Sequence, residues 1–141
     1  MTSHVILRVL SKMLIPLIML FALYVQFHGD YGPGGGFQAG VIFGAGIILY
    51  ALLFGLDEAK RAFPPRVLEI LMASGVLLYG GVGIAAILAG GNFLDYDVLS
   101  HDPHHGQHLG ILLVELGVGI TVAAVMSTIF FYFSGRGRTD V

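Results

Sequence analysis

Residues 28–40 of the chain read His28-Gly29-Asp30-Tyr31-Gly32-Pro33-Gly34-Gly35-Gly36-Phe37-Gln38-Ala39-Gly40. This glycine-rich stretch lies between two apolar stretches and leads directly into the second of them. Glycine tolerates positive φ angles and lets other backbones approach closely, at an entropic cost of about 0.5–1 kcal/mol per residue in a regular element. The stretch therefore predicts a tightly packed connection at which the chain re-enters a membrane.

The composition is that of a membrane protein. Of the 141 residues, 56% are hydrophobic and 11% are charged, with a mean hydropathy of +0.86. Soluble domains usually carry about 25% charged residues. A chain of this length has room for a few membrane spans and no separate soluble domain. It contains no cysteine, which excludes disulfides and thiolate metal sites.

Four apolar segments are each long enough for the ~20 helical residues that cross a hydrocarbon core of ~30 Å. They lack the period-two alternation of barrel strands, and backbone groups in lipid must be satisfied within the segment. The first segment could be a signal peptide, but its length and the absence of small residues at 24–27 favour a membrane anchor. We predict an all-α integral membrane protein, a single four-helix domain over residues 1–141. The predicted transmembrane helices are residues 5–27, 37–56, 67–89 and 109–133.

All lysines and arginines fall on one side of this four-span arrangement. The connections 28–36 and 90–108 contain none of them. Because cytoplasmic loops are enriched in Lys and Arg, we expect both termini and the 57–66 loop to be cytoplasmic. The cations are Arg8, Lys12, Lys60, Arg61, Arg66, Arg136 and Arg138.

The opposite face carries four aspartates and five of the six histidines. It could raise the local concentration of protons or metal cations, or it could be a solvated rim from which topology excludes cations. Neutral imidazoles suit zinc, copper, nickel or iron, and one histidine cluster is similar to the boxes of membrane di-iron desaturases. Those enzymes need several boxes, however, and they carry them on the cytoplasmic side. We therefore expect no functional metal at His101, His104, His105 and His108.

Glu115 is the only acid well inside a predicted span. It lies about 9 Å below the outer boundary if the fourth span starts near Leu109, at ~1.5 Å per residue. A charged side chain at the centre of a membrane helix costs ~2.5–3.5 kcal/mol. Glu115 could mark a proton or cation path, or it could be a neutral carboxyl bonded to a neighbouring helix. Both interpretations remain open at this point.

Glycines recur every four residues on one face of the second span, at Gly36, Gly40 and Gly44. Small residues at this spacing let helices pack closely in lipid, where no hydrophobic effect drives their association. The third and fourth spans are also rich in glycine. This pattern could serve packing within the four helices alone, but the number of glycine faces favours an oligomer or a larger complex.

Two motifs now carry a resemblance over essentially the whole chain. The stretch Pro33–Gly40, following His28 and Gly29, resembles the signature of the MnhB family, which supplies one of the small membrane proteins of the Mrp-type multisubunit cation/proton antiporters. Related proteins occur in membrane-bound hydrogenases. The stretch Glu115–Val118 resembles an acid-Leu-Gly-Val pattern in the last span of the family, where the acid is often Asp. Many members carry Gly where Ala39 stands.

The resemblance implies a small membrane subunit of a cation/proton antiporter complex in the plasma membrane, with sodium ion and proton as the transported species. Such a subunit would support assembly and line part of the ion path. Its partners would be the other membrane subunits and the lipid bilayer; we expect no nucleic acid, no cofactor and no enzymatic activity. Glu115 is the candidate for the ion path. The candidates for helix packing are Pro33, Gly34, Gly35, Gly36, Phe37, Gln38, Gly40 and Gly44.

The alternative is an autonomous, homo-oligomeric proton-coupled transporter resembling the small multidrug-resistance type. That class also uses four short spans and an intramembrane Glu. Its essential Glu lies in the first span, whereas residues 13–27 of this chain contain no acid. The antiporter subunit is therefore the favoured prediction.

Overall fold

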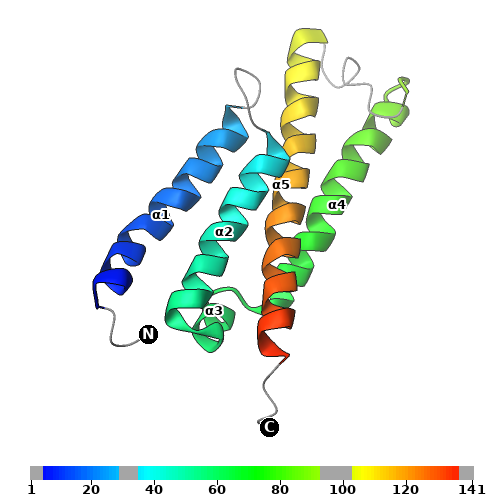
Figure 1. Cartoon of the computed structure of the whole chain (residues 1–141). Coiled ribbons are helices and arrows are strands. Elements are labelled where there is room, and N and C mark those ends of the chain that lie inside the picture. The colour runs from blue at the N-terminus through cyan, green and yellow to red at the C-terminus, as the bar shows by residue number, and fades with distance from the viewer. Residues whose placement is uncertain (1–4, 29–34, 93–102, 137–141) are drawn as a thin grey trace.

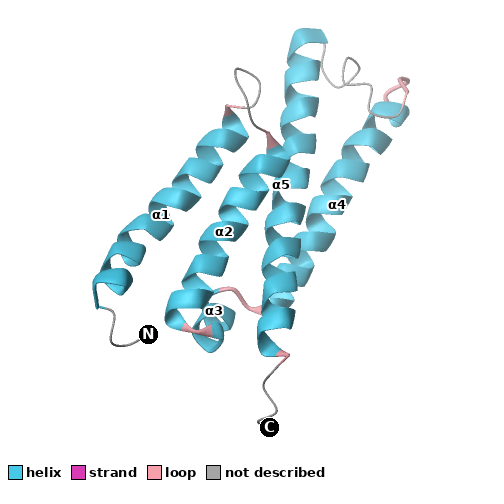
Figure 2. Cartoon of the chain, in the orientation of Figure 1, coloured by secondary structure: helices cyan, strands magenta, loops and turns pink. Residues whose placement is uncertain are grey.

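The computed structural model describes residues 5–28, 35–92 and 103–136, apart from the side chains of residues 103–108. The described part is helical and contains no strand (Figure 2). Four of its helices are long and apolar enough to cross a membrane, so the prediction of an all-α protein with four membrane helices is confirmed. The elements are α1 (Val5–Phe27), α2 (Gly36–Phe54), α3 (Leu56–Ala62), α4 (Pro65–Leu88) and α5 (Pro103–Gly135).

The last helix is the centre of the arrangement. α5 packs extensively against both α2 and α4, and α1 packs against α2. In Figure 1 the helices therefore follow the spatial order α1, α2, α5, α4. α5 has 33 residues, of which Leu109–Gly135 form the apolar part. Its beginning extends beyond the adjacent ends of α1 and α2 in Figure 1.

A short helix, α3, which the sequence analysis did not predict, follows α2. Gly55 links the two helices with a φ of 97°, a left-handed conformation that favours glycine. Pro65 then occupies the first turn of α4, where its missing N–H leaves no hydrogen bond unmade. The apolar side chains at this end pack as one cluster, formed by Ile47, Ala51, Leu56, Ala59, Leu68, Ala124 and Phe131.

The described cations gather at the same end of the molecule. Arg8 and Lys12 lie over the ring of Phe54, at 5.4 and 5.7 Å from its centroid. Lys60 and Arg61 belong to the last turn of α3. This end is where α2 and α5 end and α4 begins. The clustering follows the segregation in the sequence, and the cytoplasmic placement of this end stays a prediction.

Candidate functional site

Glu115 lies where α2 begins. A Cβ built at Gly36, the first residue of α2, would collide with the backbone oxygen of Glu115 and would lie 3.0 Å from its Cα. Only glycine permits this contact, because the atoms opposed to it belong to a backbone that cannot rotate away. The first turn of α2 is therefore fixed against α5 at the level of the acid.

The carboxyl group of Glu115 reaches towards the same helix start. Its Oε1 lies 3.2 Å from the position of a Cβ at Gly35, and Oε1 of Gln38 lies 3.6 Å from that position. Gly35 is the N-cap of α2 and supplies no side-chain hydrogen bond to the free N–H groups there. Helix N-termini carry a partial positive charge that stabilises acids nearby by about 0.3–1 kcal/mol. Glu115 is thus placed where α2 favours a negative charge.

The contact between α2 and α5 continues along one line of small residues. A Cβ at Gly40 would lie 2.7 Å from the carbonyl oxygen of Gly119 and 2.8 Å from Cβ of Val122. At Gly44 the nearest atom is Cβ of Met126, at 3.4 Å, which is an ordinary contact. The space therefore widens from the acid towards the other end of the helix pair.

The opposite side of α5 packs against α4 with similar closeness. A Cβ at Gly75 would collide with Oγ1 of Thr121 and would lie 2.7 Å from the carbonyl oxygen of Gly117. The Thr121 hydroxyl donates a hydrogen bond of 2.8 Å to the same Gly117 oxygen. This hydroxyl is satisfied within its own helix, so we assign this side of α5 a packing role.

A second polar side chain, Gln26 near the end of α1, meets α5 one turn after the acid. Its Oε1 lies 2.7 Å from the position of a Cβ at Gly119, and the backbone oxygen of Gly36 lies 3.2 Å from that position. Gln26 is only 4% exposed, and its Nε2 has no hydrogen-bond partner among the described residues. An unsatisfied buried donor costs about 1–3 kcal/mol. Gln26 is a polar residue at the end of an apolar span, and the sequence does not indicate that it meets α5.

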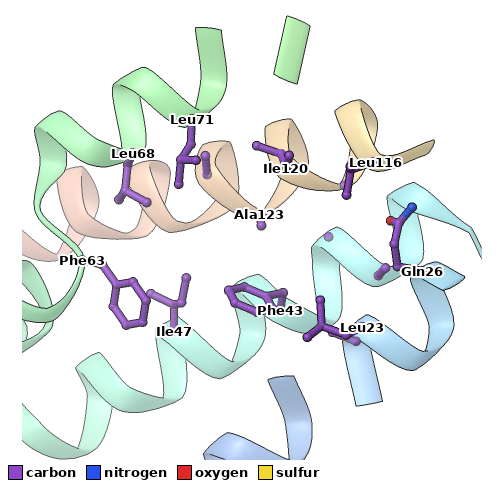
Figure 3. A pocket seen from close by; sticks show the side chains of 15 residues that line it. Leu23, Gln26, Phe43, Ile47, Phe63, Leu68, Leu71, Leu116, Ile120 and Ala123 are labelled. Atoms are coloured by element: carbon purple, nitrogen blue, oxygen red, sulfur yellow. The ribbon is translucent and has the colours of Figure 1, made fainter. Parts of the chain in front are cut away.

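An apolar pocket of about 360 Å³ lies beside this junction (Figure 3). Gln26 and Phe63 lie at its two ends, and Phe43, Leu71 and Ile120 are among the side chains between them. Gln26 is the single polar residue among those lining it. Such a lining offers no set of ligands for a cation, so the pocket is not where an ion would be held.

The sequence places Glu115 inside a span, whereas the structure places it level with the adjacent ends of α1 and α2. Position 115 is well inside α5, but α1 and α2 have their adjacent ends at this level, while α5 continues further (Figure 1). The side chain is partly exposed rather than enclosed. The acid thus lies at the level of the adjacent ends of α1 and α2.

The remaining candidates are distributed as follows. Gly35, Gly36, Gly40 and Gly44 all lie against α5, whereas Phe37 and Gln38 are exposed. Contacts within the chain thus occupy the glycine face of α2, because the spacing of glycines predicts a close helix contact but does not identify the partner helix. Outside the described residues or side chains lie Pro33, Gly34 and the histidines at His101, His104, His105 and His108.

Fold and site together define a multi-pass membrane protein whose last helix carries an acid beside the glycine-rich start of another. The chain matches, over residues 6–128, the family model described as "Domain related to MnhB subunit of Na+/H+ antiporter". It is 35% identical over 140 residues to proteins of Staphylococcus aureus strains Newman and USA300, each named "Putative antiporter subunit mnhB2". These alignments cover 97% of this chain and 98% of each relative. The chain belongs to the MnhB family.

Proposed function

We propose that this chain is a small membrane subunit of a multisubunit cation/proton antiporter complex in the plasma membrane, with both termini cytoplasmic. Membership of the MnhB family over nearly the full length carries this proposal. The relatives are named as antiporter subunits, and the four apolar helices suit a protein that assembles with others inside the bilayer. Sodium ion and proton are the species that such a complex would exchange.

Within the complex, Glu115 is our candidate for the ion path. The observation that supports it is the position of its carboxyl group at the start of α2, partly exposed and beside Gln38. A carboxyl there can hold a proton or a cation and exchange it with water at the ends of α1 and α2. Intramembrane acids that face protein or water commonly mark such paths.

Isolation of the native assembly tests the subunit role. An affinity tag on this chain, extraction in mild detergent and mass spectrometry of the purified material should identify several other membrane proteins in fixed proportion. Vesicles containing the intact assembly should exchange a monovalent cation for protons. A preparation that contains this chain alone and still transports would contradict the proposal and support the autonomous homo-oligomeric transporter.

A further inference from the structure

The buried amide of Gln26 lies beside the candidate site, and no hydrogen bond between described residues uses its nitrogen. It is 96% buried, counted from its 4% exposure, and its nitrogen has no acceptor among the described residues. We propose that Gln26 is the second hydrogen-bonding residue of the Glu115 site, and that its amide holds a water molecule shared with the Glu115 carboxyl group. The water-binding site would exist without transport, but its importance for transport rests on the proposed function of Glu115.

The geometry brings the two side chains to one junction of three helices. Gln26 approaches from α1 and reaches Gly119, one turn along α5 from Glu115. Gly119 in turn faces the carbonyl oxygen of Gly36, while the carboxyl group of Glu115 faces the preceding residue, Gly35. The amide and the acid therefore both lie at the start of α2, the amide near Gly36 and the acid near Gly35.

The chemistry of the two groups is complementary. An amide offers two N–H donors and an oxygen acceptor, and a carboxyl group accepts when it is ionised and also donates when it is protonated. Buried water molecules usually make two to four hydrogen bonds to polar groups that the protein leaves unsatisfied. A shared water molecule would satisfy the Gln26 nitrogen and remain bonded to the acid in either protonation state.

A substitution can remove the hydrogen bonding of Gln26 while keeping the size of its side chain. Gln26→Met keeps an unbranched side chain of similar length and removes the amide, with both its N–H donors and its oxygen acceptor. The matched control is Thr128→Val, because Thr128 Oγ1 is the other buried polar side-chain atom without a partner in the described part. Thr128 is 13 residues from Glu115 on α5, about 20 Å away along the helix.

The experiment is a double-mutant cycle with Glu115→Gln, measured as cation/proton exchange in everted vesicles that carry the parent complex. We expect Gln26→Met to lower exchange about fivefold in the native background and less than about twofold in the Glu115→Gln background, because coupled residues are not additive. Thr128→Val should change exchange less than about twofold in both backgrounds. Blue-native electrophoresis verifies that each complex is assembled.

The outcomes distinguish the ion-path role of Glu115 from the role of Gln26 at the same site. If Glu115→Gln leaves exchange intact, the ion-path role of Glu115 fails. If Glu115→Gln lowers exchange while Gln26→Met has no effect, or has an equal effect in both backgrounds, the role of Gln26 is overturned. A high-resolution cryo-EM map of the unmodified complex gives an answer without any variant. Density for water between the Gln26 amide and the Glu115 carboxyl group supports the proposal, and an amide that donates to another protein of the complex contradicts it.

Discussion

The two sides of α5 achieve equally close packing and carry different chemistry. Towards α4, Gly117 and Thr121 meet Gly75, and the Thr121 hydroxyl is bonded to its own helix. Towards α2, Glu115 and Gly119 meet a line of glycines, with an acid at the helix start and the buried amide of Gln26 beside it. Glycine contact by itself therefore does not identify a functional site in this protein. Our candidate site rests instead on the polar groups that lie on one side of the central helix.

The largest effect is expected where α2 closely contacts the backbone of α5 at a distance from the acid. Gly40→Leu would place a side chain against the Gly119 carbonyl oxygen, 2.7 Å from its Cβ, and would separate α2 from α5. We expect the parent complex to disappear on blue-native electrophoresis. Gly80→Leu is the control, because a Cβ at Gly80 meets no described atom within 4 Å. An intact complex with leucine at position 40 would show that the α2 side is not held by close backbone contact.

A smaller effect is expected on the α4 side. Gly75→Ala places a methyl group 2.7 Å from the Gly117 carbonyl oxygen and against the Thr121 hydroxyl. Overpacking of this kind costs about 1–3 kcal/mol, so the complex should assemble but unfold at a lower temperature. Exchange per assembled complex should remain normal, since this side carries packing alone. If a fully assembled Gly75→Ala complex lost exchange, the α4 side of α5 could not be assigned packing alone.

The smallest effect is expected at the end of the α2–α5 contact where the two helices are further apart. Gly44→Ala brings a methyl group to 3.4 Å from Cβ of Met126, an ordinary contact. Alanine also favours a helix over glycine by about 0.8–1 kcal/mol. Thermal stability should therefore be unchanged or slightly raised in a melting curve of the purified complex. Destabilisation as strong as that from Gly75→Ala would mean that the pair is tighter at this end than the contacts indicate.

Part of this arrangement could be predicted from the sequence. The four apolar helices follow from their length and composition, and the four-residue spacing of Gly36, Gly40 and Gly44 predicts a close helix contact. The spacing does not identify the partner, because a glycine face packs equally well against any helix with a small surface. The central place of α5 depends on two such faces, at Gly117 and Gly119, directed at different neighbours.

Other features depend on the three-dimensional arrangement alone. The sequence marks Glu115 as an unusual acid, but its level relative to the start of α2 depends on how the helices are staggered. Gln26, like Ile15, is a buried residue of the apolar helix α1. Nothing in the sequence indicates which helix its side chain contacts. Its contact with Gly119 joins residues that are far apart in the chain, so only the three-dimensional structure reveals it.

We propose that the acid on the α2 side transfers ions and that the α4 side does not. This proposal is tested most directly by comparing Glu115→Gln with Thr121→Val for cation/proton exchange in everted vesicles, at equal amounts of assembled complex. Both variants keep the size of the side chain. Glu115→Gln removes the ionisable carboxyl group on the α2 side of α5, and Thr121→Val removes the hydroxyl on the α4 side. We predict a loss of about fivefold or more for Glu115→Gln, with some activity kept in Glu115→Asp, and a change of less than about twofold for Thr121→Val. Normal exchange in Glu115→Gln, or equal losses in both variants, would show that Glu115 does not transfer ions as proposed.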